Sequence, residues 1–120
     1  MAEIIDDTYT LTISALQTEV ARIADVIVNG TPVVNGGSIA IEVDTPFNIE
    51  YKVYNDGGVT GNMFGRLIDA TDPENEIIIA GSDWTEDIVA GGFKTATHSF
   101  ASGISQDISL EIEAGHNALD

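Results

Sequence analysis

Two alternating runs and the turn that joins them decide the fold, in the stretch TPFNIEYKVYNDGGVTGNMFGRLIDA at residues 45–70. In the first run, apolar side chains occupy every second position between polar neighbours, at Phe47, Ile49, Tyr51 and Val53. A period of two is typical of a strand that buries one face. We therefore expect this run to be a central core strand, with residues 62–70 as its partner.

The turn between the two runs is rich in glycine, at Gly57, Gly58 and Gly61. A phosphate-binding loop would lead into a helical pattern and would end in Lys-Ser or Lys-Thr, and neither feature follows here. We interpret the segment as a strand connection in which these glycines supply positive φ angles.

Alternating runs continue on both sides of this stretch. Upstream, the pairs Asn29-Gly30 and Asn35-Gly36 separate β-branched runs, and Asn-Gly favours tight hairpin turns. Downstream, residues 91–100 and 106–114 alternate in the same way. The spacing predicts an all-β protein, an Ig-like antiparallel sandwich of about seven to nine strands.

The N-terminal run TYTLTISAL, residues 8–16, predicts a further strand. Tyr9, Leu11 and Ile13 share one face, while threonines occupy the other. An edge strand of this kind either completes its own sheet or adds to the sheet of a neighbour. These three residues are therefore candidates for partner binding, by self-association or by contact with other proteins of an assembly.

A helix is the alternative for residues 14–27, where apolar residues nearly form a helical stripe. We favour strands there and divide the chain into an N-terminal strand or arm at residues 1–20 and an Ig-like β-sandwich domain at residues 21–120. A length of 120 residues suits one such domain.

The charge of the chain restricts its partners. Twenty acidic residues against four basic ones give a formal charge of −16. Such a chain repels phosphates and anionic lipid, so we expect no nucleic acid partner. No run of about 18 apolar residues is present, so we expect no membrane insertion. The N-terminus lacks the basic and apolar regions of a signal peptide, and without cysteine the chain forms no disulfide.

Three segments carry a family resemblance: ADVIVNGTPV at residues 24–33, residues 39–69, and VAGGFKTATHSF at residues 89–100. They resemble the CARDB-like and fibronectin-like Ig sandwiches of bacteria and archaea over about residues 24 to 114. The family pattern V-x-N-x-G is matched by Val53, Asn55 and Gly57. The resemblance implies an adhesion, spacer or assembly module without catalysis. The N-terminal extension departs from the family.

Acidic loops offer weak candidates for a metal site, at Asp69, Asp72, Glu74 and Asp83. Calcium takes six to eight oxygen ligands, which loops at the end of a sandwich can supply. The spacing does not match an EF-hand, and Asp-Pro commonly opens a turn. We expect a solvated loop and no cofactor, with calcium as the one candidate metal.

The sequence argues against an enzyme. Asp69 and Asp72 could pair as the two carboxylates of a glycosidase, but such enzymes use a cleft lined with aromatic residues, and few are present. His98 and His116 have no serine or acid placed for a triad, and we expect both at the surface. The lone Trp84 is a candidate partner-binding residue, although we favour a place in the core.

We expect a non-enzymatic structural or interaction protein, a subunit of a larger assembly such as a virion decoration or minor capsid protein. The alternative is a carbohydrate- or calcium-binding adhesion module of a secreted or surface protein. A virion or a cell surface is the expected location in either case.

Overall fold

The computed structural model describes residues 2–13 and 20–117 and contains eight strands, with no helix among these residues. The strands are β1 (Ala21–Val28), β2 (Thr31–Pro32), β3 (Phe47–Asn55), β4 (Gly61–Asp69), β5 (Ile77–Ile78), β6 (Trp84–Ile88), β7 (Phe93–Phe100) and β8 (Leu110–His116). Every pairing between them is antiparallel. The prediction of an all-β, antiparallel protein is confirmed. The helical alternative is wrong for residues 21–27, and residues 14–19 lie outside the described part.

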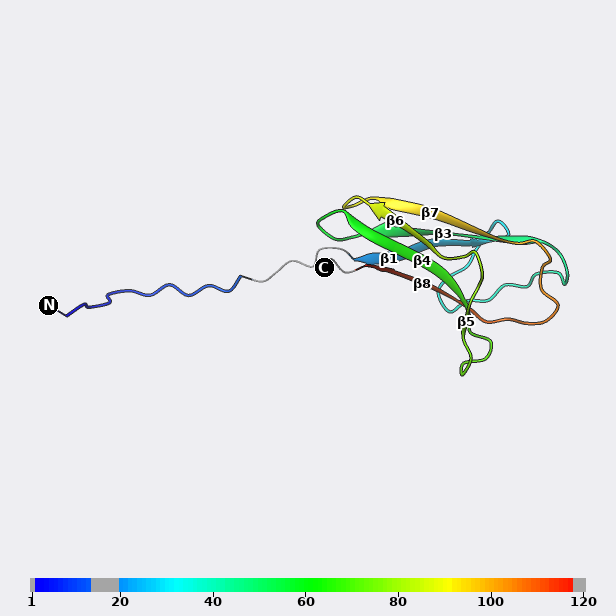
Figure 1. The fold of residues 1–120 in the computed structure, drawn as a ribbon, viewed down its shortest axis with the longest axis horizontal. Coiled ribbons are helices and arrows are strands. Elements are labelled where there is room, and N and C mark those ends of the chain that lie inside the picture. Colours follow the sequence, from blue (N-terminus) through cyan, green and yellow to red (C-terminus); the bar gives the residue numbers. More distant parts are fainter. Residues whose placement is uncertain (1, 14–19, 118–120) are drawn as a thin grey trace.

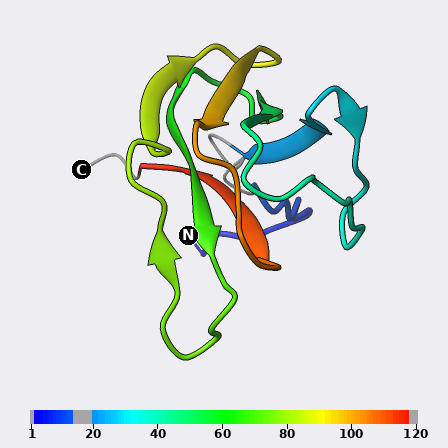
Figure 2. The same cartoon turned by 90° about the vertical axis from the view of Figure 1, so that its right-hand side faces the viewer.

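The strands form two sheets that face one another (Figures 1 and 2). One sheet has the order β2-β1-β3-β7, so β3 pairs with β1 and β7. The expected pairing of β3 with residues 62–70 is wrong, because β4 lies in the facing sheet. In the other, β4 pairs along one edge with β6 and β5, through residues 61–65 and 68–69. Its other edge pairs with β8, through residues 63–69. No described strand pairs with β8 on the side away from β4, so β8 is the outer strand of its sheet.

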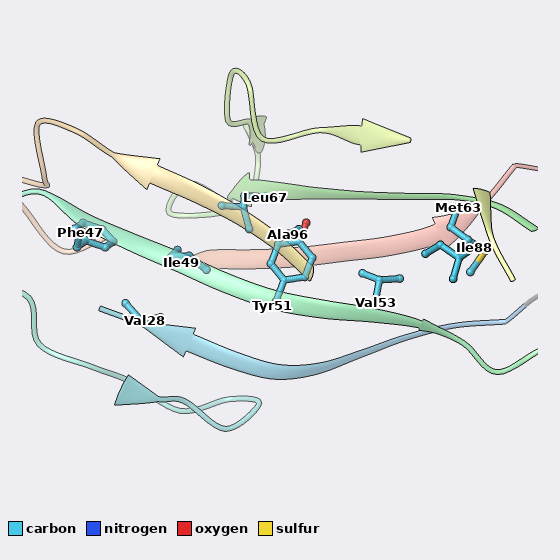
Figure 3. Packing of buried hydrophobic residues seen from close by; sticks show 9 residues of the cluster. All are labelled: Val28, Phe47, Ile49, Tyr51, Val53, Met63, Leu67, Ile88 and Ala96. Carbon is cyan, nitrogen blue, oxygen red and sulfur yellow. The ribbon is translucent and has the colours of Figure 1, made fainter. Parts of the chain in front are cut away.

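The core lies between the two sheets and draws on both (Figure 3). Every second residue of β3 is buried, as the alternation of this run predicts. Val53, Met63 and Leu67 have no exposed surface at all. The remaining members of the buried cluster are Val28, Phe47, Ile49, Tyr51, Ile88 and Ala96.

The side chain of Asn55 organises the turn between β3 and β4. Asn55 is fully buried, and its Nδ2 donates hydrogen bonds to the carbonyl oxygens of Val59 (2.8 Å) and Ile88 (2.9 Å). Its Oδ1 accepts a hydrogen bond from the backbone N–H of Gly57 at 2.9 Å. One amide therefore ties the glycine-rich turn to the end of β6.

The predicted role of the three glycines in this turn is wrong. Positive φ angles occur at other glycines of the described chain, and Gly57, Gly58 and Gly61 are not among them. The hydrogen bonds of a buried asparagine shape this connection, so it does not need left-handed backbone there.

The two Asn-Gly pairs behave differently. Asn29 and Gly30 both have positive φ, 50° and 81°, and they join β1 to β2 as a tight hairpin. This pair confirms the sequence prediction, because a two-residue hairpin of the mirror-image type requires positive φ at both positions. The turn at residues 35–36 is closed by a hydrogen bond from the N–H of Gly37 to the carbonyl of Val34, at 2.8 Å, and it does not join two strands.

Residues 2–13 form no strand, which contradicts the strand predicted to begin at residue 8. They extend beyond the end of the sheets where β1 begins (Figure 1), and the molecule measures 88 Å along its longest axis against 30 and 27 Å. Alternation shows which residues could share a strand face, but a strand also needs a neighbour for its backbone hydrogen bonds. Among the residues that the structure describes, residues 8–13 have no such neighbour.

Candidate functional site

The N-terminal arm, residues 2–13, exposes apolar side chains that nothing in the described chain covers. Tyr9 is 90% exposed, Leu11 66% and Ile13 86%. Ile4 and Ile5 are also largely exposed. Monomeric proteins rarely expose so many large apolar side chains together, and such patches usually mark interaction sites. All three arm residues predicted to bind a partner are therefore accessible to one.

A groove of about 1280 Å³ opens between the two sheets beside β8. One wall consists of β1 residues and the segment 32–41, and the other consists of residues 107–112, which run into β8. Buried core residues form its floor, among them Phe47, Ile49 and Leu67. These floor residues are themselves buried, and half-buried apolar side chains such as Ile39, Leu110 and Ile112 line the groove above them.

All four basic residues lie in the described ranges, and each makes two interactions with other side chains. Each one forms an ion pair with a carboxylate and lies over an aromatic ring. The sets are Arg22 with Asp56 and Tyr54, Lys52 with Asp25 and Phe93, Arg66 with Glu113 and Phe64, and Lys94 with Glu86 and Trp84. The surface therefore presents no cluster of unpaired cations to a phosphate, and its excess charge is negative.

The acidic loop after β4 is bonded within itself. Asp69 accepts hydrogen bonds from the hydroxyl and, with a smaller effect, the N–H of Thr71, and these bonds lower the pKa of the Asp69 carboxyl. Asp72 accepts bonds from the side chain of Asn75 and the N–H of Glu74, which lower its pKa as well. These contacts are those of Asx turns.

The four weak metal candidates do not converge. Among the described residues, no three histidine, aspartate or glutamate side chains come together in a way that could hold a metal ion. Asp69, Asp72, Glu74 and Asp83 therefore do not form such a group.

Trp84 lies against the core. Its indole Nε1 donates a hydrogen bond of 2.9 Å to the hydroxyl of Tyr51, which is buried. The ring lies over Gly65, where an added Cβ would approach it to 2.6 Å. The indole is half-buried, and its remaining surface lies beside Lys94. This position agrees with the interpretation that Trp84 packs against the core.

The two histidines predicted at the surface are both only partly exposed. His98 is half-buried on the inner face of β7, and its ring stands edge-on to Phe100 at a centroid distance of 5.2 Å. It shares that face with Ala96, so the alternation of β7 could have placed it there. His116 is also half-buried and lies opposite Met63 in the pairing of β8 with β4.

Sequence reasoning missed the groove beside β8 and the three hydrogen bonds of Asn55. The groove and the bond from Asn55 to Ile88 join segments far apart in the chain, which no local pattern reports, whereas the bonds to Gly57 and Val59 lie within the turn itself. The described residues contain no helix with the length and apolarity needed to cross a bilayer. Comparisons with protein-family models, with curated proteins and with solved structures found no match to this chain.

Proposed function

We propose that this protein is a non-enzymatic structural protein that joins other copies of itself in a larger assembly, at a virion or cell surface. A virion decoration or minor capsid protein is the form we favour. The contact is made by residues 8–13 of the N-terminal arm, through Tyr9, Leu11 and Ile13.

One observation carries the proposal: the apolar face of the arm is exposed in the single chain. An extended segment with one apolar face and free backbone groups is suited to pair with the edge of another sheet. Association would bury these side chains and satisfy the backbone groups at the same time. An acidic outer surface keeps the assembled copies hydrated.

We interpret the two facing sheets as an Ig-like sandwich. The resemblance to CARDB-like and fibronectin-like domains supports this interpretation, because Asn55 and Gly57 of the V-x-N-x-G pattern are bonded to each other at the end of β3. Domains of this kind serve as spacers and assembly modules, which agrees with the proposed function.

The charge state of the acidic loop supports a role without catalysis. A glycosidase needs one carboxylic acid with a raised pKa to protonate the leaving group. The pKa values of Asp69 and Asp72 are both lowered by hydrogen bonds to their carboxylates. Neither group is therefore prepared to donate a proton near neutral pH.

The test is the mass in solution, measured by light scattering behind a sizing column at micromolar concentration and moderate salt. The full chain should give a defined oligomer, and deletion of residues 2–13 should give a folded monomer. Replacing Tyr9, Leu11 and Ile13 with serine should also dissociate it. The matched control replaces Thr8, Thr10 and Thr12 with serine and should keep the oligomer.

A full chain that elutes only as a 12.7 kDa monomer would contradict the proposal. The alternative, an adhesion module that binds calcium or carbohydrate, would then gain weight. Calcium that binds the native state raises the melting temperature, so a thermal scan with and without calcium chloride separates the two functions.

A further inference from the structure

We infer that residues 8–13 of one copy insert as an extra strand into the groove beside β8 of a second copy. This inference rests on the proposed function and names the surface that receives the arm. Each copy then offers one arm and one groove.

The groove has the features of a site that lacks a strand. β8 is the outer strand of its sheet, and every second residue of such a strand directs its N–H and C=O groups away from the sheet. Beside that edge, half-buried apolar side chains line the groove, among them Ile39, Ile41, Leu110 and Ile112, and an added strand could bury them further. In Figure 2, β1 (blue) and β8 (orange to red) lie toward the same open side of the molecule. The chain segment that follows β2 lies across from β8 on that side.

The arm matches the groove in length. The wall that leads into β8 consists of six consecutive residues, 107–112. The last three of these belong to β8, which continues to His116 and so has seven residues. Residues 8–13 number six and as an extended strand would span roughly 20 Å, close to the length of β8. Pairing along the edge of β8 would direct Tyr9, Leu11 and Ile13 toward the apolar floor and the three threonines toward solvent, because strand side chains alternate between faces.

The arm also matches the groove in charge. Three carboxylates line the groove, Asp25, Asp107 and Glu111, and no lysine or arginine does. An acidic segment would be repelled there, whereas residues 8–13 carry no charged side chain. The carboxylates of the arm all fall within residues 3–7 and would stay outside the groove.

The position of the arm favours a second copy over the arm's own groove. Residues 2–13 extend past the end of the sheets where β1 begins, whereas loops at the opposite end line much of the groove (Figure 1). A contact between an arm and a groove is heterologous, so copies join head to tail and form rings or filaments. Because each copy carries a charge of −16, assembly should strengthen as salt increases.

Cysteine cross-linking tests this inference cleanly, because the natural chain has no cysteine. The variant Thr10→Cys with Glu111→Cys places thiols on the exposed faces of the arm and of β8. A second variant, Thr12→Cys with Glu111→Cys, allows for a shift of register by two residues. The control is Thr10→Cys with Phe93→Cys, since Phe93 is exposed on the open edge of β7.

Mild oxidation should give a ladder of dimers and higher multimers in at least one Glu111→Cys variant and none in the control, on a non-reducing gel. Reductant should return the ladder to monomer. All the replaced side chains are exposed, Thr10, Thr12 and Glu111 being polar and Phe93 aromatic, and circular dichroism checks that each variant is folded.

Three results would overturn the inference. A ladder in the control alone would place the arm on β7, and the proposed function would survive. A fast-migrating monomer with an internal disulfide would show that the arm fills its own groove. Failure to cross-link in a protein that is also monomeric by light scattering would overturn both the groove contact and the proposed function.

Discussion

Replacing Asn55 with alanine tests how the glycine-rich turn is built. The substitution removes three hydrogen bonds, to the carbonyl oxygens of Val59 and Ile88 and from the N–H of Gly57. Each such bond contributes about 1 kcal/mol net, and a buried carbonyl left without a donor costs about 1 to 3 kcal/mol more. Because Asn55 is fully buried, we expect the free energy of unfolding to fall by roughly 4 kcal/mol.

Urea denaturation followed by tryptophan fluorescence measures this change, with Trp84 as the reporter. The midpoint should fall strongly while the slope stays constant, which is the sign of lost stability without a change in the surface exposed on unfolding. Asn48→Ala is the matched control, because Asn48 is an exposed asparagine of the same strand. It should change stability by no more than about 0.5 kcal/mol.

A loss below about 1 kcal/mol for Asn55→Ala would refute this account, because it would mean that water or other groups replace all three bonds. An equal loss at Asn48 would also refute it. The effect would then belong to the strand in general and not to the buried amide.

Three further predictions concern backbone strain, pH and salt. Gly103→Ala should lower the free energy of unfolding by roughly 2 to 4 kcal/mol, measured in urea. Gly103 has a φ of 65°, and the added Cβ would lie 2.5 Å from the carbonyl oxygen of Thr45. An unchanged urea midpoint would contradict this clash. Burial raises the pKa of Tyr51, and its hydrogen bond with Trp84 has a smaller, opposite effect on that pKa. As pH rises, the unfolded chain therefore loses the phenolic proton before the folded chain does. The free energy of unfolding should fall above about pH 10. In Tyr51→Phe, the melting temperature should be lower at neutral pH but should fall less between neutral and alkaline pH. An unaltered fall of the melting temperature at alkaline pH would contradict the role given to Tyr51. Sodium chloride between about 0.05 and 1 M should raise the urea midpoint, because it screens the repulsion within a chain of charge −16; a falling midpoint would show that the four ion pairs dominate instead.

Much of the sheet structure was predictable because it depends on neighbours in the chain. The alternation of residues 47–53 correctly predicted a strand with one buried face, since side chains of a strand point alternately to its two sides. The pair Asn29-Gly30 correctly predicted a hairpin, since few other residues adopt positive φ at low cost. The surplus of carboxylates is a property of composition alone.

The arm shows the limit of such local reasoning. Its alternation is as regular as that of β3, yet residues 8–13 form no strand, because a strand exists only where another backbone is present to pair with it. The sequence determined which face of the arm is apolar, and only the tertiary structure showed that this face has no partner in the described part of the chain.

The sequence by itself determined the strand faces, the tight hairpin and the acidic charge, because these depend on residues a few positions apart or on a simple count. The tertiary structure alone decided that β8 keeps an open edge, that a groove lies beside it, and that Asn55 bonds to Ile88, 33 positions along the chain. Those features depend on which strands pair and which edges stay free, and pairing is settled by the packing of the whole chain.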